Sequence, residues 1–582
     1  MEGLEVTVLL GLTILVGILL APRLRLALPL VLVILGLLLG FVPALREVQL
    51  PPETVLLLFL PVMLFWESLT TSLRSIRRDF RYILPMSTLL VVASAFAVAG
   101  IGVACGLPWE IALILGAAVA PPDATAVAAL GRLLPQRLFM KLKAESLTND
   151  GTALVLYGVA VSIALGGQVT AWTVTWTVVV SYVGGIAAGG VIATLGYLLL
   201  RRTASTLVIN VTLLLIPFSA FLLAEVIHAS GVLAVVVAGL IVAIVAPRVT
   251  TAASRRQADA AWPFGVFLLN GALFILIGLE VQFVVHELPL AAIGKLVLVS
   301  LAVWGTLLAV RFLFQYLNVP FQRMQSGPRP PRGVGTRMRL VSTAAGMRGA
   351  VSLAIALSVP ASVGEAAGIA GRDAIVFITA CVILLSLLAQ GPLLPAIVRW
   401  ARLPVDPAAD EEYELAERTI SGASLAAIDD LAAEHGIGQE VRDRVRAEGY
   451  LQLEYANART LAREQAVIDA EARQLDAMLD EPDPLAVDAP NGMPLAPLPT
   501  TDATGAVSLQ MIATSTNVDL VQRSPLVRHE ELVTLKLALL DRKREVLLGL
   551  RRTGTVDDLV VRRISARLDL EQVRLQGIEE LD

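Results

Sequence analysis

An aspartate, Asp150, stands inside a strongly apolar segment that continues to about residue 165. A charged side chain in such a segment costs roughly 2.5–3.5 kcal/mol on membrane-insertion scales, so it marks a functional site by default. Ser146 lies four residues earlier and therefore on the same face of a helix. A carboxylate and a hydroxyl on one face suit a small hard cation, or a proton in its place. We therefore predict that Asp150 and Ser146 hold a cation.

A second carboxylate, Asp123, follows two adjacent prolines in another apolar segment. Adjacent prolines remove two backbone donors and break a helix. The carbonyls that this break frees, including that of Pro122, can ligate a cation. Asp123 itself has two interpretations, which are capping of the half-helix that it begins and a direct part in cation binding.

A buried arginine is expected at Arg348, which follows Gly346 and precedes Gly349 in a third apolar segment. Such a cation needs a partner. Glu145 lies five residues before Asp150 and points about 140° away from it. We predict that Glu145 pairs with Arg348 and leaves Asp150 available; the alternative is that Arg348 neutralises the carbonyl ends of broken helices.

Four further charges lie in or near apolar segments. Glu67 is interpreted either as an accessory ion ligand or as a residue near the cytoplasmic interface that reaches water. Glu225, Glu280 and Arg311 lie near the ends of predicted spans, where snorkelling or structural pairing is expected.

The elements that position these residues are predicted to be membrane-spanning helices. The chain has 582 residues, is 56% hydrophobic and has a mean hydropathy of +0.73, which excludes a soluble globular protein. Thirteen segments are long or apolar enough to cross a bilayer. They are roughly 3–21, 26–43, 54–70, 83–106, 109–130, 138–165, 171–200, 205–227, 230–247, 262–284, 289–318, 340–361 and 374–400.

Arginines alternate from loop to loop along these segments. The loops after spans 1, 3, 5, 7, 9 and 11 carry 18 arginines, and the other loops carry two, Arg46 and Arg372. By the positive-inside rule the arginine-rich loops are cytoplasmic. We therefore expect a multi-pass protein of the plasma (inner) membrane with its N-terminus outside and its C-terminal tail in the cytoplasm.

Spans 5 and 12 share an interruption in the middle of the span, at Pro121–Asp123 and at Gly346–Gly349. Paired interruptions in corresponding positions are typical of transporters built from inverted repeats. Two six-span units joined by span 7 fit the count, and an offset of seven spans makes their orientations opposite. Since irregular backbone at membrane depth must line a cavity or be buried in protein, the two breaks should meet near the midplane.

The chain divides by composition into a basic membrane domain, 1–404, and an acidic tail. The first part has 27 Lys and Arg against 16 Asp and Glu, and the remainder has 19 against 34, a pattern that does not suggest nucleic-acid binding. Residues 405–480 and 525–582 are predicted to be helical tail segments, with Thr555 and Asp558 forming a capping box. The Pro-rich segment 481–524 between them is predicted to be a flexible linker. The tail is expected to serve dimer contact or regulation.

Enzymatic chemistry is not expected. The four histidines show no metal-ligand spacing, the two cysteines lie in apolar segments, and no nucleophile–base pair is recognisable. We predict no resident cofactor, only a transported cation: Na⁺, with Li⁺ and K⁺ as alternatives.

Four motifs together resemble sodium/proton antiporters of the NhaP/NHE type over all thirteen spans. They are ESLTND (145–150), APPDATAV (120–127), GMRGAVSLAIALSVP (346–360) and SGVLAVVVAGL (230–240). The resemblance implies a homodimer, a dimerisation domain, a six-helix core domain and an elevator-like movement of the core.

The resemblance also implies site roles. Asp150 alternately binds cation and proton, and Ser146, the backbone near Pro122–Asp123 and Glu67 help to ligate the cation. Glu145 pairs with Arg348, and Asn149 supports the site. Many members have Thr-Asp-Pro where this chain has Pro-Asp-Ala at 122–124, so a threonine ligand is lost, and Thr125 is a candidate substitute.

The expected function is electroneutral exchange of one cation for one proton, contributing to pH homeostasis. A single site that holds either ion has the same charge in both directions, and Asn149 stands where electrogenic relatives carry a second acid. A K⁺/H⁺ antiporter is the alternative within this class. An ion channel or a membrane sensor is a more distant alternative, although neither a repeated pore loop nor a signalling domain is recognisable.

Overall fold

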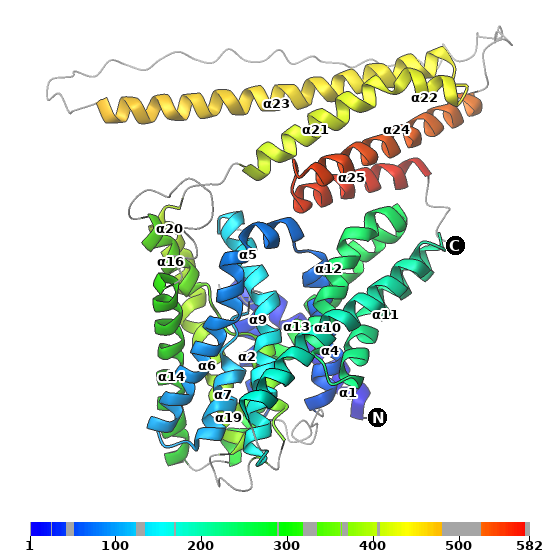
Figure 1. Cartoon of the computed structure of the whole chain (residues 1–582). Helices are drawn as coiled ribbons and strands as arrows, with labels where there is room; N and C mark the ends of the chain where they lie inside the picture. Colours follow the sequence, from blue (N-terminus) through cyan, green and yellow to red (C-terminus); the bar gives the residue numbers. More distant parts are fainter. Residues whose placement is uncertain are drawn as a thin grey trace. The chain divides into compact units, whose positions relative to one another are not determined.

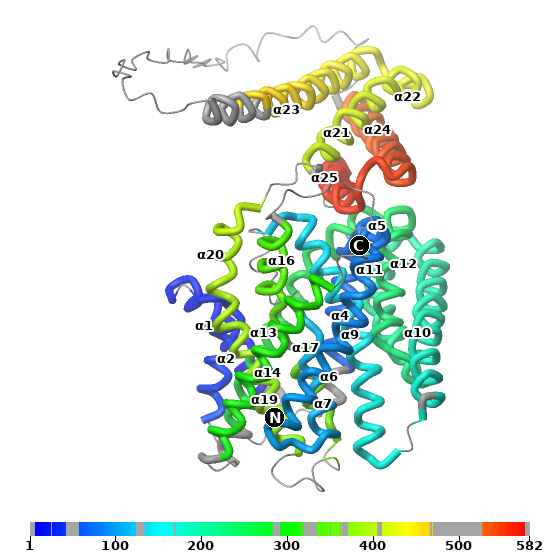
Figure 2. Tube along the Cα trace, turned by 60° about the vertical axis from the view of Figure 1, so that its left-hand side comes forward, coloured from blue at the N-terminus to red at the C-terminus, as the bar shows by residue number. Residues whose placement is uncertain are grey.

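The computed structural model describes residues 2–24, 26–41, 52–123, 134–167, 170–287, 290–317, 334–360, 363, 371–403, 408–479 and 525–576. The elements in these ranges are all helices (Figure 1, Figure 2). The chain forms two compact units. The first comprises residues 1–409 with residues 557–570, and the second comprises residues 410–556 with residues 571–580.

The first unit contains the apolar helices, and a helix occurs in each of the thirteen predicted spans. Their bounds are α1 (Glu2–Leu24), α2 (Leu28–Leu39), α4 (Pro52–Leu69), α5 (Leu73–Ser87), α6 (Leu89–Ala104), α7 (Trp109–Val119), α9 (Gln136–Ala164), α10 (Ala171–Leu200), α11 (Thr206–Val226), α12 (Gly231–Val249), α13 (Ala252–Glu287), α14 (Leu290–Leu317), α16 (Val334–Ala344), α17 (Ala350–Leu357), α19 (Arg372–Leu385), the π-helix η3 (Ser386–Gln390) and α20 (Gly391–Ala401). In the described ranges, nine helical stretches are long and apolar enough to cross a membrane, and α2, α7 and the apolar part of α4 are shorter. The prediction of an all-helical membrane fold is confirmed.

These helices pack as two groups. The first group contains α1, α2, α4 and α10–α13, and the second contains α5, α6, α7, α9, α14, α16, α17, α19 and α20. Packing repeats at an offset of seven spans: α1 packs on α2 as α11 packs on α12, and α7 packs on α9 as α17 packs on α19. Each six-span repeat therefore supplies its first three spans to the first group and its last three to the second.

Small residues let helices of the first group approach at backbone distance. A Cβ atom added at Gly36 of α2 would lie 2.1 Å from the carbonyl oxygen of Ile275. A Cβ atom added at Gly278 of α13 would lie 2.2 Å from the carbonyl oxygen of Val33. Such close contacts are how membrane helices associate without a hydrophobic driving force between them.

Large apolar side chains on the outside of this unit are exposed, including Leu12 and Leu19 of α1 and Leu207 and Leu214 of α11. Trp172 and Trp176 stack at the start of α10 with ring centroids 6.4 Å apart. Exposed aliphatic side chains bounded by tryptophans are typical of a lipid-facing surface.

The second unit is the greater part of the tail. Its helices are α21 (Ala408–Ala426), α22 (Ile428–Glu434), α23 (Gln439–Leu479) and α24 (Pro525–Thr553). Its core is formed by Ile428, Val441, Val445, Leu535 and Leu539. The helical tail is thus confirmed, whereas the predicted linker 481–524 lies outside the described residues.

The last helix, α25 (Asp558–Gln576), differs from prediction in two respects. Its first part, residues 557–570, belongs to the compact unit of the membrane helices rather than to the tail. Its N-terminus is capped by Asp557, whose Oδ1 accepts a hydrogen bond of 3.0 Å from the Leu559 amide, so the expected cap at Thr555 is wrong.

Candidate ion-binding site

The two interrupted helices meet. α7 ends at Val119, just before Pro121 and Pro122, and the break in the other helix separates α16 from α17. The amide of Asp123 donates a hydrogen bond of 2.8 Å to the carbonyl oxygen of Met347, which joins one break to the other. The predicted meeting of the two breaks is confirmed.

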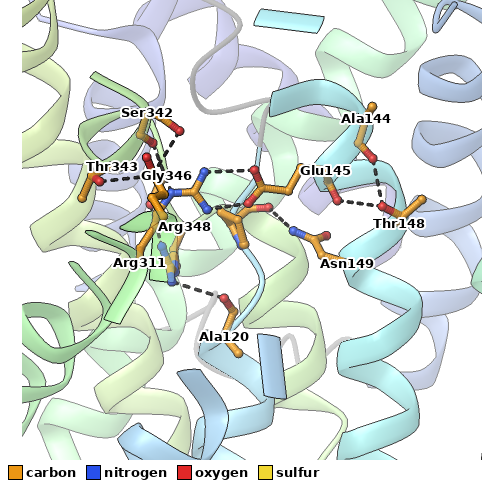
Figure 3. A network of polar contacts seen from close by, with 12 residues as sticks. Ala120, Ala144, Glu145, Thr148, Asn149, Arg311, Ser342, Thr343, Gly346 and Arg348 are labelled. Atoms are coloured by element: carbon orange, nitrogen blue, oxygen red, sulfur yellow. Dashed lines mark hydrogen bonds and ion pairs between the residues drawn. The ribbon is translucent and has the colours of Figure 1, made fainter. Parts of the chain in front are cut away.

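Arg348 lies buried between these breaks and binds backbone carbonyls from both. Its Nε donates to the Val119 oxygen at 2.9 Å, and its Nη2 donates to the Ala120 oxygen at 3.2 Å. Its Nη1 donates to the Gly346 oxygen at 2.6 Å. These oxygens lie at the C-terminal ends of α7 and α16, where helix dipoles concentrate negative charge. Arg348 therefore neutralises the ends of broken helices, as the alternative interpretation expected (Figure 3).

Glu145 pairs with Arg311, so the predicted pair with Arg348 is wrong. The two groups form a bidentate contact, with Nη1–Oε1 and Nη2–Oε2 distances of 2.5 and 3.1 Å (Figure 3). Both side chains are almost fully buried. Arg311 lies on α14, and its Nε also donates to the carbonyl oxygen of Ser342 at 3.1 Å. Of the two interpretations given for Arg311, structural pairing holds.

Two glycines of the second break leave space for charged groups. A Cβ atom at Gly349 would lie 1.6 Å from Oδ2 of Asp123. A Cβ atom at Gly346 would lie 2.6 Å from Nε of Arg311. Both charged side chains thus occupy space that any larger residue at these positions would fill.

Three carboxylates from three separate elements interact electrostatically with one another beside the breaks. Asp150 on α9 interacts electrostatically with Asp123, which follows α7, and with Glu67 on α4. Glu67 in turn interacts with Asp123. Asp123 and Asp150 are buried, and Ser146 is buried one turn before Asp150. Asp150, Asp123 and Glu67 thus lie within electrostatic range of one another, and Ser146 lies on the same helix as Asp150.

Asn149 connects α9 to the first break. Its Nδ2 donates a hydrogen bond of 2.9 Å to the carbonyl oxygen of Pro122. Its Oδ1 is buried and accepts no hydrogen bond from the described residues. The amide thus fixes one of the two carbonyl lone pairs of Pro122 and presents an oxygen of its own nearby.

The transmembrane model of the sodium/hydrogen exchanger family matches residues 10–400. The chain belongs to the sodium/hydrogen exchanger family. It is thus a multi-pass membrane antiporter, and the resemblance noted from its motifs is confirmed.

Two relatives are similar to the exchanger in sequence, and one solved structure shares its fold. It is 37% identical over 580 residues to the uncharacterized Na⁺/H⁺ exchanger Rv2287 of Mycobacterium tuberculosis, covering 98% of this chain and 96% of that one. It is 31% identical over 404 residues to the Na⁺/H⁺ antiporter ApNhaP of Aphanothece halophytica, covering 66% and 71%. The fold is similar to that of the sodium proton antiporter MjNhaP1 from Methanocaldococcus jannaschii, with a TM-score of 0.53, 19% identity and coverage of 69% and 98%.

Sequence reasoning about this exchanger missed Lys143. This lysine lies on α9, interacts electrostatically with Glu67 and donates a hydrogen bond of 2.5 Å to Oγ1 of Thr70. It stands three residues before Ser146 and seven before Asp150, so helical periodicity places all three on one face. The same face argument that selected Ser146 could have found it.

Thr125 and the half-helix that Asp123 was expected to cap lie outside the described residues. Within the described ranges, no three His, Cys, Asp or Glu side chains gather to hold a metal ion. Asp150, Ser146 and Glu67 therefore stay predicted ligands of a transported cation, which backbone and hydroxyl oxygens would also bind.

Proposed function

We propose that the exchanger carries one monovalent cation, Na⁺ in the first place, against one proton, and that both ions bind in turn at Asp150. The observation that supports this proposal is the burial of Asp150 beside Asp123 and Glu67, at the meeting point of two broken helices. Broken helices at membrane depth expose backbone dipoles that bind ions in secondary transporters.

The ligands are oxygen atoms of three elements. Asp150 supplies the exchangeable charge, and Ser146, Glu67 and the backbone of Pro122 and Asp123 complete the shell. Lys143 offsets part of the negative charge of Glu67, with which it interacts. Glu145 and Arg348 are positioning residues, since both are already engaged with other groups.

Exchange is electroneutral because one carboxylate binds either one cation or one proton. Asn149 carries no charge, and its Nδ2 is engaged by the Pro122 carbonyl. The loaded site therefore has the same charge in both directions, and membrane voltage does not bias the cycle.

Alternating access is an elevator-like movement of the second helix group against the first. The three carboxylates come from both groups, since Glu67 belongs to the first, while Asp123 and Asp150 belong to the second. A shift of one group against the other would take apart and rebuild this shell. The first group serves as the contact of a homodimer, with the N-terminus outside and the tail in the cytoplasm.

The choice of cation depends on few ligands. The Pro-Asp-Ala sequence at 122–124 removes a threonine hydroxyl, which is the feature that keeps K⁺ as an alternative substrate.

A channel or a sensor is less favoured, because the buried charges near the breaks are neutralised within the protein instead of lining an open pore.

Proton flux into sealed vesicles of the purified protein tests the proposal. Addition of Na⁺, Li⁺ or K⁺ is expected to move protons equally with and without a voltage clamp, and the ranking names the cation. Asp150→Asn is expected to abolish the flux, whereas Glu225→Gln, an exposed acid of α11, is expected to retain it. When pH falls below the pKa of the site carboxylate, the cation concentration for half-maximal rate should rise by about tenfold for each unit of decrease in pH. The reason is that one proton competes with the cation for the carboxylate. Full exchange by folded Asp150→Asn would overturn the site.

A further inference from the structure

The first part of α25 makes a dense set of polar contacts with the membrane helices. Residues 557–570 form one compact unit with residues 1–409, although α24 just before them belongs to the other unit. The contacts fall into two sets, one made by Asp557 and Asp558 and the other by Arg562 and Asp569. The same stretch also has buried apolar residues (Val560, Val561, Ile564 and Leu568).

The first set joins α25 to the start of α5. Ser72 Oγ donates to Oδ2 of Asp557 at 3.0 Å and to Oδ2 of Asp558 at 3.3 Å. The amide of Arg74 donates to Oδ2 of Asp558 at 3.2 Å, and Ser75 Oγ donates to Oδ2 of Asp557 at 3.2 Å. Two carboxylates thus face the N-terminus of α5, where they satisfy free N–H groups and complement the helix dipole.

The second set joins α25 to α4 and α13. Arg562 donates to the carbonyl oxygen of Leu69 at 3.2 Å and to Oδ1 of Asp259 at 2.9 Å. Its guanidinium lies over the ring of Trp66, 5.0 Å from the centroid. Arg255 forms a bidentate pair with the buried Asp569, with distances of 2.7 and 2.6 Å.

These two sets fall on different helix groups. α4 and α13 belong to the first group, and α5 belongs to the second. Residues 70–72 connect α4 directly to α5. α25 therefore bridges the two groups at a point where the chain passes from one to the other. Its Arg562 lies over Trp66, the residue before Glu67.

We propose that α25 is an intramolecular latch that ties the two helix groups together and slows exchange while it is docked. The proposal rests on the proposed function, because a latch between the groups matters only if the groups move. A shift of α5 relative to α13 would have to break either the Asp557–Asp558 set or the Arg562–Asp569 set. The chain enters α25 directly from α24, so a change in the second unit has a covalent route to the latch.

Charge reversal within one pair tests the latch. Asp569→Arg places two cations in contact with each other and is expected to raise the rate of cation-driven proton flux in vesicles by about fivefold or more, the lower end of ordinary coupling between sites. Asp569→Arg combined with Arg255→Asp restores an opposite-charge pair and is expected to return the rate toward that of the wild type. Arg574→Ala changes an exposed arginine of the same helix and serves as the matched control.

Docking is measured separately from transport. Hydrogen exchange of the amides in 557–570 is expected to be slow in the wild type, fast in Asp569→Arg and slow again in the reversed pair. A variant that undocks α25 by this measure but exchanges ions at the wild-type rate or more slowly would overturn the latch alone. Wild-type vesicles with no exchange would instead overturn the proposed function, and the latch with it.

Discussion

Each of the two buried arginines near the breaks is neutralised by its own partners. Arg311 is matched by the carboxylate of Glu145, whereas Arg348 is matched by three backbone carbonyls. Each arginine has to keep its own partners, because a buried charge without compensation is costly. Asp150 lies in neither arrangement, which leaves its carboxylate available for the ion exchange that we propose.

Loss of the Arg311 guanidinium is expected to destabilise the protein. Arg311→Met leaves Glu145 buried without its partner, which should cost about 3–5 kcal/mol. Arg311→Met combined with Glu145→Met removes both charges and should recover most of the loss. Thermal unfolding of the purified protein in detergent measures both effects, and equal midpoints for the single and double variants would contradict the pairing.

Gly349 is expected to tolerate no side chain. In Gly349→Ala the new Cβ atom would overlap Oδ2 of Asp123, so the carboxylate or the break must shift. Overpacking of this kind costs about 1–3 kcal/mol, and the displacement of Asp123 should also reduce exchange. Gly158→Ala on α9 is the matched control, since a Cβ atom there meets nothing within 4 Å. Normal exchange in Gly349→Ala would show that Asp123 is free to move without consequence.

The ends of the interrupted helices are stabilised by the guanidinium of Arg348, since the helices do not continue there. The ends of α7 and α16 point carbonyl oxygens at one place, and Arg348 binds oxygens from both ends. A further contact comes from the π-helix η3, where Ser386 Oγ accepts a hydrogen bond of 3.3 Å from the Arg348 amide. The breaks are therefore built elements with defined partners.

The thermal stability of Arg348 variants should depend on how many backbone carbonyls the new side chain can bind. Arg348→Met leaves the carbonyl ends without a donor and should lower the unfolding midpoint strongly. Arg348→Lys keeps the charge but cannot reproduce the planar fork, so an intermediate midpoint is expected. The order arginine, lysine, methionine in thermal unfolding checks this reading. A lysine variant as stable as wild type would mean that charge alone suffices.

At the scale of the whole molecule, polar contacts join helices of the two groups in the part of the chain that the structure describes. One is the hydrogen bond of 2.8 Å between Thr152 on α9 and Tyr182 on α10. Another is the bond between Lys143 on α9 and Thr70 after α4. α9 thus carries Asp150 and Ser146 of the proposed ion site and also contacts the first group. Movement of one group against the other should therefore be detectable at α9.

A cross-link between the groups is expected to stop exchange. In a background with Cys105→Ser and Cys381→Ser, Thr152→Cys and Tyr182→Cys joined by a short bifunctional thiol reagent should abolish flux, and reductive release should restore it. The matched control is Tyr157→Cys with Ser358→Cys, since these hydroxyls lie 3.0 Å apart within the second group. Equal flux through both cross-linked proteins would contradict movement between the groups.

The helices, their interruptions and the face of α9 that carries Ser146 and Asp150 could all be predicted from the sequence. These follow from local causes: apolar runs of membrane length, adjacent prolines, and a period of 3.6 residues. The sequence also nominated Asp123 and Glu67, because a charge in an apolar segment is conspicuous wherever the segment lies.

The pairing of the buried charges could not be predicted, because it depends on how the helices pack against one another. The sequence predicted Arg348 as the partner of Glu145. The partner is Arg311 of α14, because of the way in which the helices pack. The docking of α25 depends likewise on contacts between residues nearly five hundred positions apart in the chain, such as Ser72 and Asp557. Periodicity fixes directions within one helix, but it contains no information about which helix lies opposite.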